Sequence, residues 1–124
     1  MKIYRPRQII GLDKLVSLKI LHLQGTHRDI ETILRKLTLL KSLTLWENYS
    51  PFDIPNLLSL KNLCLYACCA VNVFSDNLEN VKIEKNRTTL KLESKVLRNI
   101  TLINNPILVS YRKNQNLTVM VKQQ

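Results

Sequence analysis

The chain has 124 residues, 45% of them hydrophobic, and its 19 Lys and Arg residues against 9 Asp and Glu residues give a net charge of +10. This length suits a single domain. No apolar run is long enough to span a membrane, and the opening MKIYRPRQIIGLDK lacks the apolar core of a secretory signal. The three cysteines do not form an even disulfide framework. We therefore expect an intracellular, cytoplasmic protein.

The first feature along the chain is an incomplete copy of a pattern that later recurs. Ile3 lies 20 residues before Leu23, so residues 1–15 are expected to form a partial coil, with apolar residues Ile9, Ile10, Leu12 and Leu15. The full pattern then starts near residues 18, 40, 60, 78 and 97, and a degraded copy starts near 116. The copies read LKILHLQGT, LKSLTLWEN, LKNLCLYAC, LENVKIEKN, LRNITLINN and NLTVMVKQQ. Recurrence at this period predicts one repeat domain over residues 1–124.

Each position of the pattern has a physical reason. The second and third apolar residues are two apart, so on an extended strand both point into the core while their neighbours point outward. This predicts parallel strands centred near residues 22, 44, 64, 82, 101 and 120. The ninth residue closes the turn and is expected to form a ladder that satisfies buried backbone groups. The ladder positions are Thr26, Asn48, Cys68, Asn86 and Asn105.

The pattern LxxLxLxx(N/C/T) resembles that of the leucine-rich repeat superfamily, in particular its short intracellular forms. The resemblance covers residues 15–124 and implies an α/β fold: a curved, right-handed solenoid with a parallel β-sheet on its concave face. It also implies a scaffold that binds ligands, and it identifies no particular partner or pathway.

The connecting segments should change along the chain. HRDIETILRKL places Ile30, Ile33, Leu34 and Leu37 on one helical face, which predicts a helix. The segment NYSPFDIPNLL contains two prolines and is expected to be extended or a tight turn. Later connections are shorter, so the convex face should become irregular or 3₁₀. A small outer strand at Leu90 and Leu92 is an alternative.

Signals for an enzyme are sparse. With two glycines there is no phosphate-binding loop, and no histidine pair has the spacing of metal ligands. The repeat places Cys64 outward, two strands from His22 and about 10 Å away, which is too far for a catalytic dyad. We therefore expect no catalytic residues, no metal and no cofactor.

The outward face of the predicted sheet carries the candidate binding residues. Trp46 and Tyr66 occupy equivalent places on adjacent strands, so their rings should stack side by side, with His22 on the same face. Exposed aromatic residues are frequent in interfaces. The alternative is that Trp46 folds over the strand and covers core leucines.

A second candidate surface lies at the incoming ends of the strands. Lys19, Lys41 and Lys61 occupy the same place in successive repeats and should form one exposed column. The column is either a solvated rim or a surface that attracts acidic ligands. These observations predict a non-enzymatic protein-interaction module whose partner has an acidic surface. RNA or another anionic surface is the second candidate, and a structural fragment of a longer array is the third.

Overall fold

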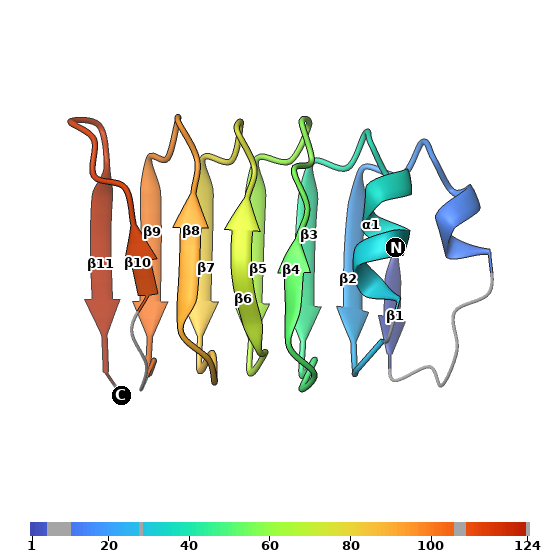
Figure 1. Ribbon diagram of the computed structural model, residues 1–124, viewed down its shortest axis with the longest axis horizontal. Helices are drawn as coiled ribbons and strands as arrows, with labels where there is room; N and C mark the ends of the chain where they lie inside the picture. The colour runs from blue at the N-terminus through green and yellow to red at the C-terminus, as the bar shows by residue number, and fades with distance from the viewer. Residues whose placement is uncertain (5–10, 28, 106–108, 124) are drawn as a thin grey trace.

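The computed structural model describes residues 1–4, 11–27, 29–105 and 109–123. Within these residues the chain winds as a β-solenoid of about five turns, with two parallel sheets facing each other (Figure 1). Strands of the longer sheet run downward in Figure 1 and strands of the shorter sheet run upward. We call the turns at the top of that view the upper edge and those at the bottom the lower edge.

Sheet A contains the strands of the repeated pattern, and their predicted positions are confirmed. Its order is β1-β2-β3-β5-β7-β9-β11, with every neighbouring pair parallel. Equivalent repeat positions pair directly, as Leu21 does with Leu43 and Leu43 with Leu63. The strands are β1 Lys2–Tyr4, β2 Ile20–Gln24, β3 Ser42–Trp46, β5 Asn62–Tyr66, β7 Asn80–Glu84, β9 Asn99–Ile103 and β11 Thr118–Lys122.

The outer layer differs from the expected α/β architecture. The predicted helix is present as α1 Ile30–Lys36, and a 3₁₀ helix η1 covers Leu12–Lys14. Beyond α1, however, the connections form a second parallel sheet, sheet B, in the order β10-β8-β6-β4. Irregular or 3₁₀ segments were expected there, and that expectation is wrong. Sheet B contains β4 Phe52–Ile54, β6 Ala70–Phe74, β8 Leu90–Glu93 and β10 Val109–Tyr111.

Coil length explains this second sheet. Repeats of 18 to 20 residues leave too few residues for a helix between two strands of sheet A. Extended segments in register lie about 4.8 Å from their equivalents in the next coil, where their backbone groups can pair instead of being buried without partners. Leu90 and Leu92 point into the core from β8, as the alternative prediction had it.

The two edges use different turns. At the upper edge, a backbone bond from residue i+3 to residue i closes a β-turn in successive coils, as from Leu40 to Leu37 and from Leu60 to Leu57. At the lower edge, the residue after each of β2, β3, β5, β7 and β9 has a positive φ, although in most of these coils it is not glycine. These residues are Gly25, Glu47, Ala67, Lys85 and Asn104. One left-handed residue per coil turns the chain from sheet A toward sheet B.

The core between the sheets is aliphatic. The strand leucines, such as Leu21, Leu43 and Leu65, are almost fully buried, and so is the first leucine of four repeats, whereas that of the first repeat, Leu18, is partly buried. In the partial first coil Leu12 is buried, but Leu15 is exposed and does not join the core as expected. The expected contributions of Ile9 and Ile10 lie outside the described residues. The last strand is less complete, since Val121 is 65% exposed.

The predicted ladder is present in part. The Cys68 thiol donates to the carbonyls of Leu45 and Tyr66 at 3.3 and 3.4 Å. The side-chain amide of Asn105 makes the equivalent bonds, to Ile83 at 2.7 Å and to Ile103 at 3.2 Å. Each links its own strand to the preceding one, as a ladder requires.

Asn86 fulfils the ladder role with different partners. It is 1% exposed, its Oδ1 accepts from the backbone N–H of Ala70 at 3.1 Å, and its Nδ2 donates to the carbonyls of Ala70 and Thr88. Its own N–H donates to Asn105 Oδ1 at 2.9 Å, which joins two ladder residues directly.

The other two ladder positions differ from the prediction. Thr26 is exposed, and its hydroxyl accepts from the Tyr49 N–H at 3.0 Å. Asn48 is 1% exposed, as expected, but neither its Nδ2 nor its Oδ1 has a hydrogen-bond partner among the described residues. The expected bonds from Asn48 to turn backbone are therefore wrong.

Candidate functional site

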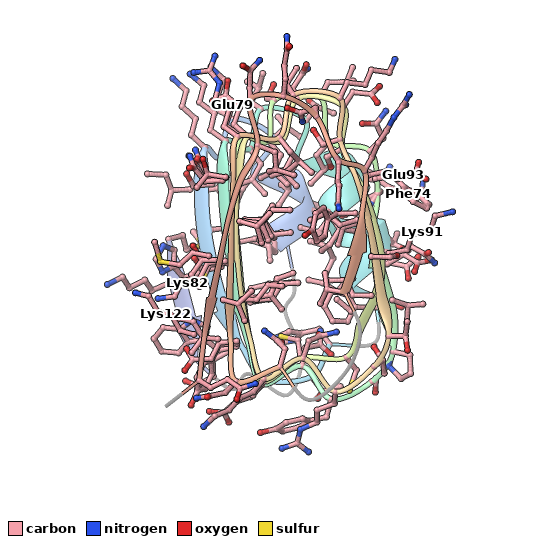
Figure 2. The ribbon with its side chains drawn as sticks, turned by 90° about the vertical axis from the view of Figure 1, so that its left-hand side faces the viewer. Phe74, Glu79, Lys82, Lys91, Glu93 and Lys122 are labelled. Carbon is pink, nitrogen blue, oxygen red and sulfur yellow. The ribbon has the colours of Figure 1, made fainter. Side chains whose placement is uncertain are left out.

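The outer face of sheet A carries three rows of side chains that cross the strands. The upper row contains Ser42, Asn62, Asn80 and Asn99, the middle row contains His22, Thr44, Cys64, Lys82 and Thr101, and the lower row contains Gln24, Trp46, Tyr66 and Glu84. Figure 2 shows Lys82 projecting from this face, with Lys122 on the same side and Phe74, Lys91 and Glu93 on the opposite side.

The upper row is a continuous hydrogen-bonded ladder. Asn62 Nδ2 donates to Ser42 Oγ at 3.3 Å, Asn80 Nδ2 to Asn62 Oδ1 at 2.9 Å, and Asn99 Nδ2 to Asn80 Oδ1 at 2.7 Å. Each amide is held in one orientation because it donates to one neighbour and, except at the end, accepts from the next. The sequence placed these residues on the face, but we did not predict their bonds. Their shared repeat position was the available signal.

An open hollow of about 350 Å³ lies between the upper and middle rows. Its walls come from β3, β5, β7 and β9, with Thr44, Cys64 and Lys82 on one side and the asparagine ladder on the other. The hollow thus offers amide donors and acceptors, one thiol and one ammonium group. Such a surface suits a polar ligand that lies across the strands.

Cysteine chemistry in this hollow is weak. Burial raises the pKa of the Cys64 thiol, although Lys82 opposes the shift. Cys68 belongs to the buried ladder and does not line the hollow, and burial raises its pKa to about 11. Thiols with a raised pKa stay protonated near neutral pH and react slowly. His22 pairs with Thr44 and Thr44 with Cys64, so His22 lies two strands from Cys64, as the repeat predicted.

Trp46 and Tyr66 lie at the lower end of the face and are in contact. Their ring centroids are 6.4 Å apart at an interplanar angle of 63°, so the rings meet edge to face instead of stacking in parallel as expected. Trp46 is 40% exposed, and Tyr66 is partly buried. Ile103 pairs with Glu84 of the lower row, a place where the alternation of the repeat predicts an outward side chain, but it is buried.

Two cationic side chains each lie over an aromatic ring at this lower edge. The Lys85 ammonium lies 5.7 Å from the centroid of the Tyr66 ring, and the Arg87 guanidinium lies 4.8 Å from that of Tyr49. Cations over aromatic faces are attracted by the ring electrons. The contact between Arg87 and Tyr49 spans the coil that lies between them, and Cys69 in that coil is buried. We did not predict either contact from the sequence, because it depends on the conformation of the turns.

The lysine column has the predicted geometry. The Lys41 N–H donates to the Lys19 carbonyl and the Lys61 N–H to the Lys41 carbonyl, and all three side chains are exposed. Glu79 and Arg98 continue the column, and Figure 2 shows Glu79 at the upper edge.

The predicted partner-binding residues therefore form two groups at opposite ends of the strands, as their repeat positions predicted. Lys41 directly precedes β3, and Trp46 lies five positions further along the chain, about 16 Å away. His22 lies in the middle row on β2, between these two groups. A single small ligand cannot contact the lysine column and the aromatic pair together, whereas a macromolecule can.

Comparisons with known proteins add no assignment. No family model matches the chain, and the comparisons with curated proteins and with solved structures also gave no match. The resemblance to leucine-rich repeats thus rests on the sequence pattern alone. Among the described residues, no group of three or more His, Cys, Asp or Glu side chains is placed to hold a metal ion, and no helix there is long and apolar enough to cross a membrane.

One buried histidine gives a testable pH dependence. His27 is buried, and Nε2 has no hydrogen-bond partner among the described residues. Burial lowers the pKa of His27 below the ordinary value of 6.5, and a hydrogen bond with the Gln24 backbone partly opposes this shift. The unfolded chain therefore binds more protons below pH 6.5, and stability falls as the pH drops from 6.5 toward the folded pKa.

We expect the free energy of unfolding, measured with urea at pH 7.5 and pH 5.5, to decrease at the lower pH. His27→Leu should lose less stability over this interval than the native chain. His22, whose pKa is also lowered by burial, remains in the variant, so the difference between the two proteins isolates His27. An identical loss in both proteins would assign the effect to other groups.

Proposed function

We propose that this protein is a non-enzymatic interaction module of the leucine-rich repeat type that binds a protein partner on the outer face of sheet A. The observation that carries the proposal is the exposed Trp46–Tyr66 contact beside a hollow lined by an ordered amide ladder. Rigid aromatic side chains supply most of the binding energy in many interfaces. Polar groups already held in place lower the entropic cost of binding.

The partner should have an apolar group for the aromatic pair and acidic groups toward the lysine column. Lys82 in the hollow and Lys41 at the upper end of the same face favour negative charge. Glu84, which follows Tyr66 in the lower row, limits this preference at the lower end of the face. The arrangement supports an extended contact over the face, both across and along the strands, more than a pocket for a small molecule.

The experiment compares the two faces of the solenoid. A photoreactive amino acid replaces Thr44 on sheet A or, as the matched control, Ser110 on β10 of sheet B. After irradiation in an extract of the producing cells, crosslinked proteins are identified by mass spectrometry, and binding is then measured with purified components. A partner crosslinked only from position 44, which binds the purified chain, supports the proposal. Equal crosslinking from both faces, or none, contradicts it.

A second candidate is binding to an anionic polymer or surface, which the net charge of +10 favours. Salt separates the two functions. Affinity for a polyanion falls linearly on a log–log plot against salt because counterions are released. A protein complex centred on the aromatic pair should depend much less on salt.

A further inference from the structure

The upper edge carries an apolar feature that the proposed protein interface does not use, beside the lysine column that it shares with that interface. The central residues of β-turns are usually Gly, Asn, Asp, Ser or Pro. In the first three coils, however, these turns expose aliphatic side chains. We call them the aliphatic ridge: Leu15, Val16, Leu39 and Leu58, which are 41%, 53%, 48% and 63% exposed.

The turns place the ridge residues in line. Backbone bonds from Leu18 to Leu15, from Leu40 to Leu37 and from Leu60 to Leu57 close the same turn in each coil. Val16, Leu39 and Leu58 are central residues of these turns, at the outermost point of each coil. Val16 and Leu58 are the second residues of their turns and Leu39 is the third, and neighbouring strands are about 4.8 Å apart, so the ridge is a short staggered row of apolar side chains. Figure 1 shows these turns projecting from the upper edge.

Cations flank the ridge on both sides. The lysine column of Lys19, Lys41 and Lys61 lies on the side of sheet A, and Arg35 and Lys36 lie in the last turn of α1 on the other side. Lys14 ends η1 just before the ridge begins. Residues 14–19, 35–41 and 57–61, which build this part of the edge, contain six Lys and Arg residues and no Asp or Glu.

Carboxylates mark the limits of this region. Asp13 precedes it in η1, and the fourth coil has Asp76 and Asn77 at its turn, followed by Glu79 beside Lys61. The carboxylates thus interrupt the apolar and cationic region at the fourth coil. Beyond it, Val96 in the corresponding turn of the next coil is a single exposed aliphatic residue, 41% exposed.

We propose that this edge docks on a membrane surface that contains anionic lipids. Aliphatic side chains at projecting turns can enter the boundary between headgroups and acyl chains, while adjacent lysines and arginines bind anionic headgroups. Charge complementarity selects an anionic surface, and the apolar tips select a lipid over a nucleic acid, which offers phosphates but no apolar layer to enter. The proposal does not rest on the protein partner of sheet A.

The first test is co-sedimentation of the purified chain with vesicles of phosphatidylcholine alone or with 30% phosphatidylserine. We expect binding to the anionic vesicles only. Leu39→Ser with Leu58→Ser should weaken it about tenfold, and reversal of Lys19, Lys41 and Lys61 to Glu about a hundredfold or more. The matched controls are Val121→Ser, at an equally exposed aliphatic residue elsewhere, and Glu replacements of Lys2, Lys91 and Lys122, which change the net charge equally.

Circular dichroism and thermal melting verify that each variant folds. If the double serine variant is unfolded, the single substitution Leu58→Ser replaces it, and if the triple reversal is unfolded, the single reversal Lys41→Glu replaces it. The proposal is overturned if the chain binds neither vesicle, if the serine variants bind like the native chain, or if the control reversal weakens binding as much as reversal of the lysine column. Displacement from the vesicles by single-stranded RNA with no effect of the serine variants would assign the cations to nucleic acid and also overturn it.

The second test measures orientation, and it uses the fact that the chain has one tryptophan. Trp46 lies at the lower end of β3, at the edge opposite the ridge. Lipids with brominated acyl chains quench only tryptophans that reach them. Trp46 in the bound native chain should stay unquenched, whereas Leu58→Trp in a Trp46→Phe background should be quenched. The opposite result would place the lower edge on the membrane and overturn the proposal. Vesicle binding unchanged by Trp46→Ala would also keep this site distinct from the proposed protein interface.

Discussion

Replacing Trp46 by Ala should weaken binding of the sheet A partner by about 2 kcal/mol or more, roughly a thirtyfold loss of affinity. The indole is 40% exposed, so most of its surface contacts the protein, yet enough remains free to enter an interface. Truncation also removes the edge-to-face contact with Tyr66, which we expect to cost about 0.5–1.5 kcal/mol of folding free energy.

The measurement pairs affinity with stability for the same variants. Titration calorimetry with the partner crosslinked from position 44 gives the loss of affinity, and urea unfolding gives the loss of stability. Phe74→Ala is the matched control, because Phe74 is equally exposed but lies on sheet B under the Lys91 ammonium. A large loss of stability with unchanged affinity would identify Trp46 as a cover of the core, which was the alternative interpretation of the sequence.

The sequence predicted sheet A well because its strands repeat a specific spacing. Apolar residues two apart that recur at one place in successive repeats define a buried face, and the recurrence fixes the register between coils. The helix α1 was predictable for a similar reason, since Ile30 and Leu34 recur with helical spacing. In both cases the spacing of apolar residues along the chain predicts the secondary structure.

Sheet B had no comparable signal. Its strands are three to five residues long, and segments such as Phe52–Ile54 and Val109–Tyr111 share no motif. They are strands because neighbouring coils align their backbones, which is a property of the stack and not of any one segment. The contacts of Arg87 with Tyr49 and of Lys85 with Tyr66 were not predicted because they depend on the conformation of turns in the stack of coils.

The positions of both candidate surfaces were predictable from the repeat. The register places Trp46 beside Tyr66 and Lys41 beside Lys19, at opposite ends of the strands, as the sequence predicted. The exposed Leu39 and Leu58 were missed because leucine at these positions resembles a core residue until the turn is known.

Asn86→Ala should destabilise the fold far more than Asn48→Ala, although both residues occupy the same repeat position and both are 1% exposed. Removal of the Asn86 amide leaves the N–H of Ala70 without its acceptor in a fully buried position. An unsatisfied buried donor costs about 1–3 kcal/mol. The Ala70 carbonyl keeps a partner, because it also accepts from the Thr88 hydroxyl at 2.8 Å.

Asn48 presents the reverse case. Its buried amide makes no hydrogen bond with the described residues, so truncation removes a desolvation penalty while it also leaves a small cavity. These effects oppose each other, and we expect a change within about 1 kcal/mol. Urea unfolding of the two variants in parallel measures both values against the native chain. Equal losses would show that the Asn48 amide does have a partner in solution, and that the ladder continues unbroken from the Asn105 coil to the coil of Asn48.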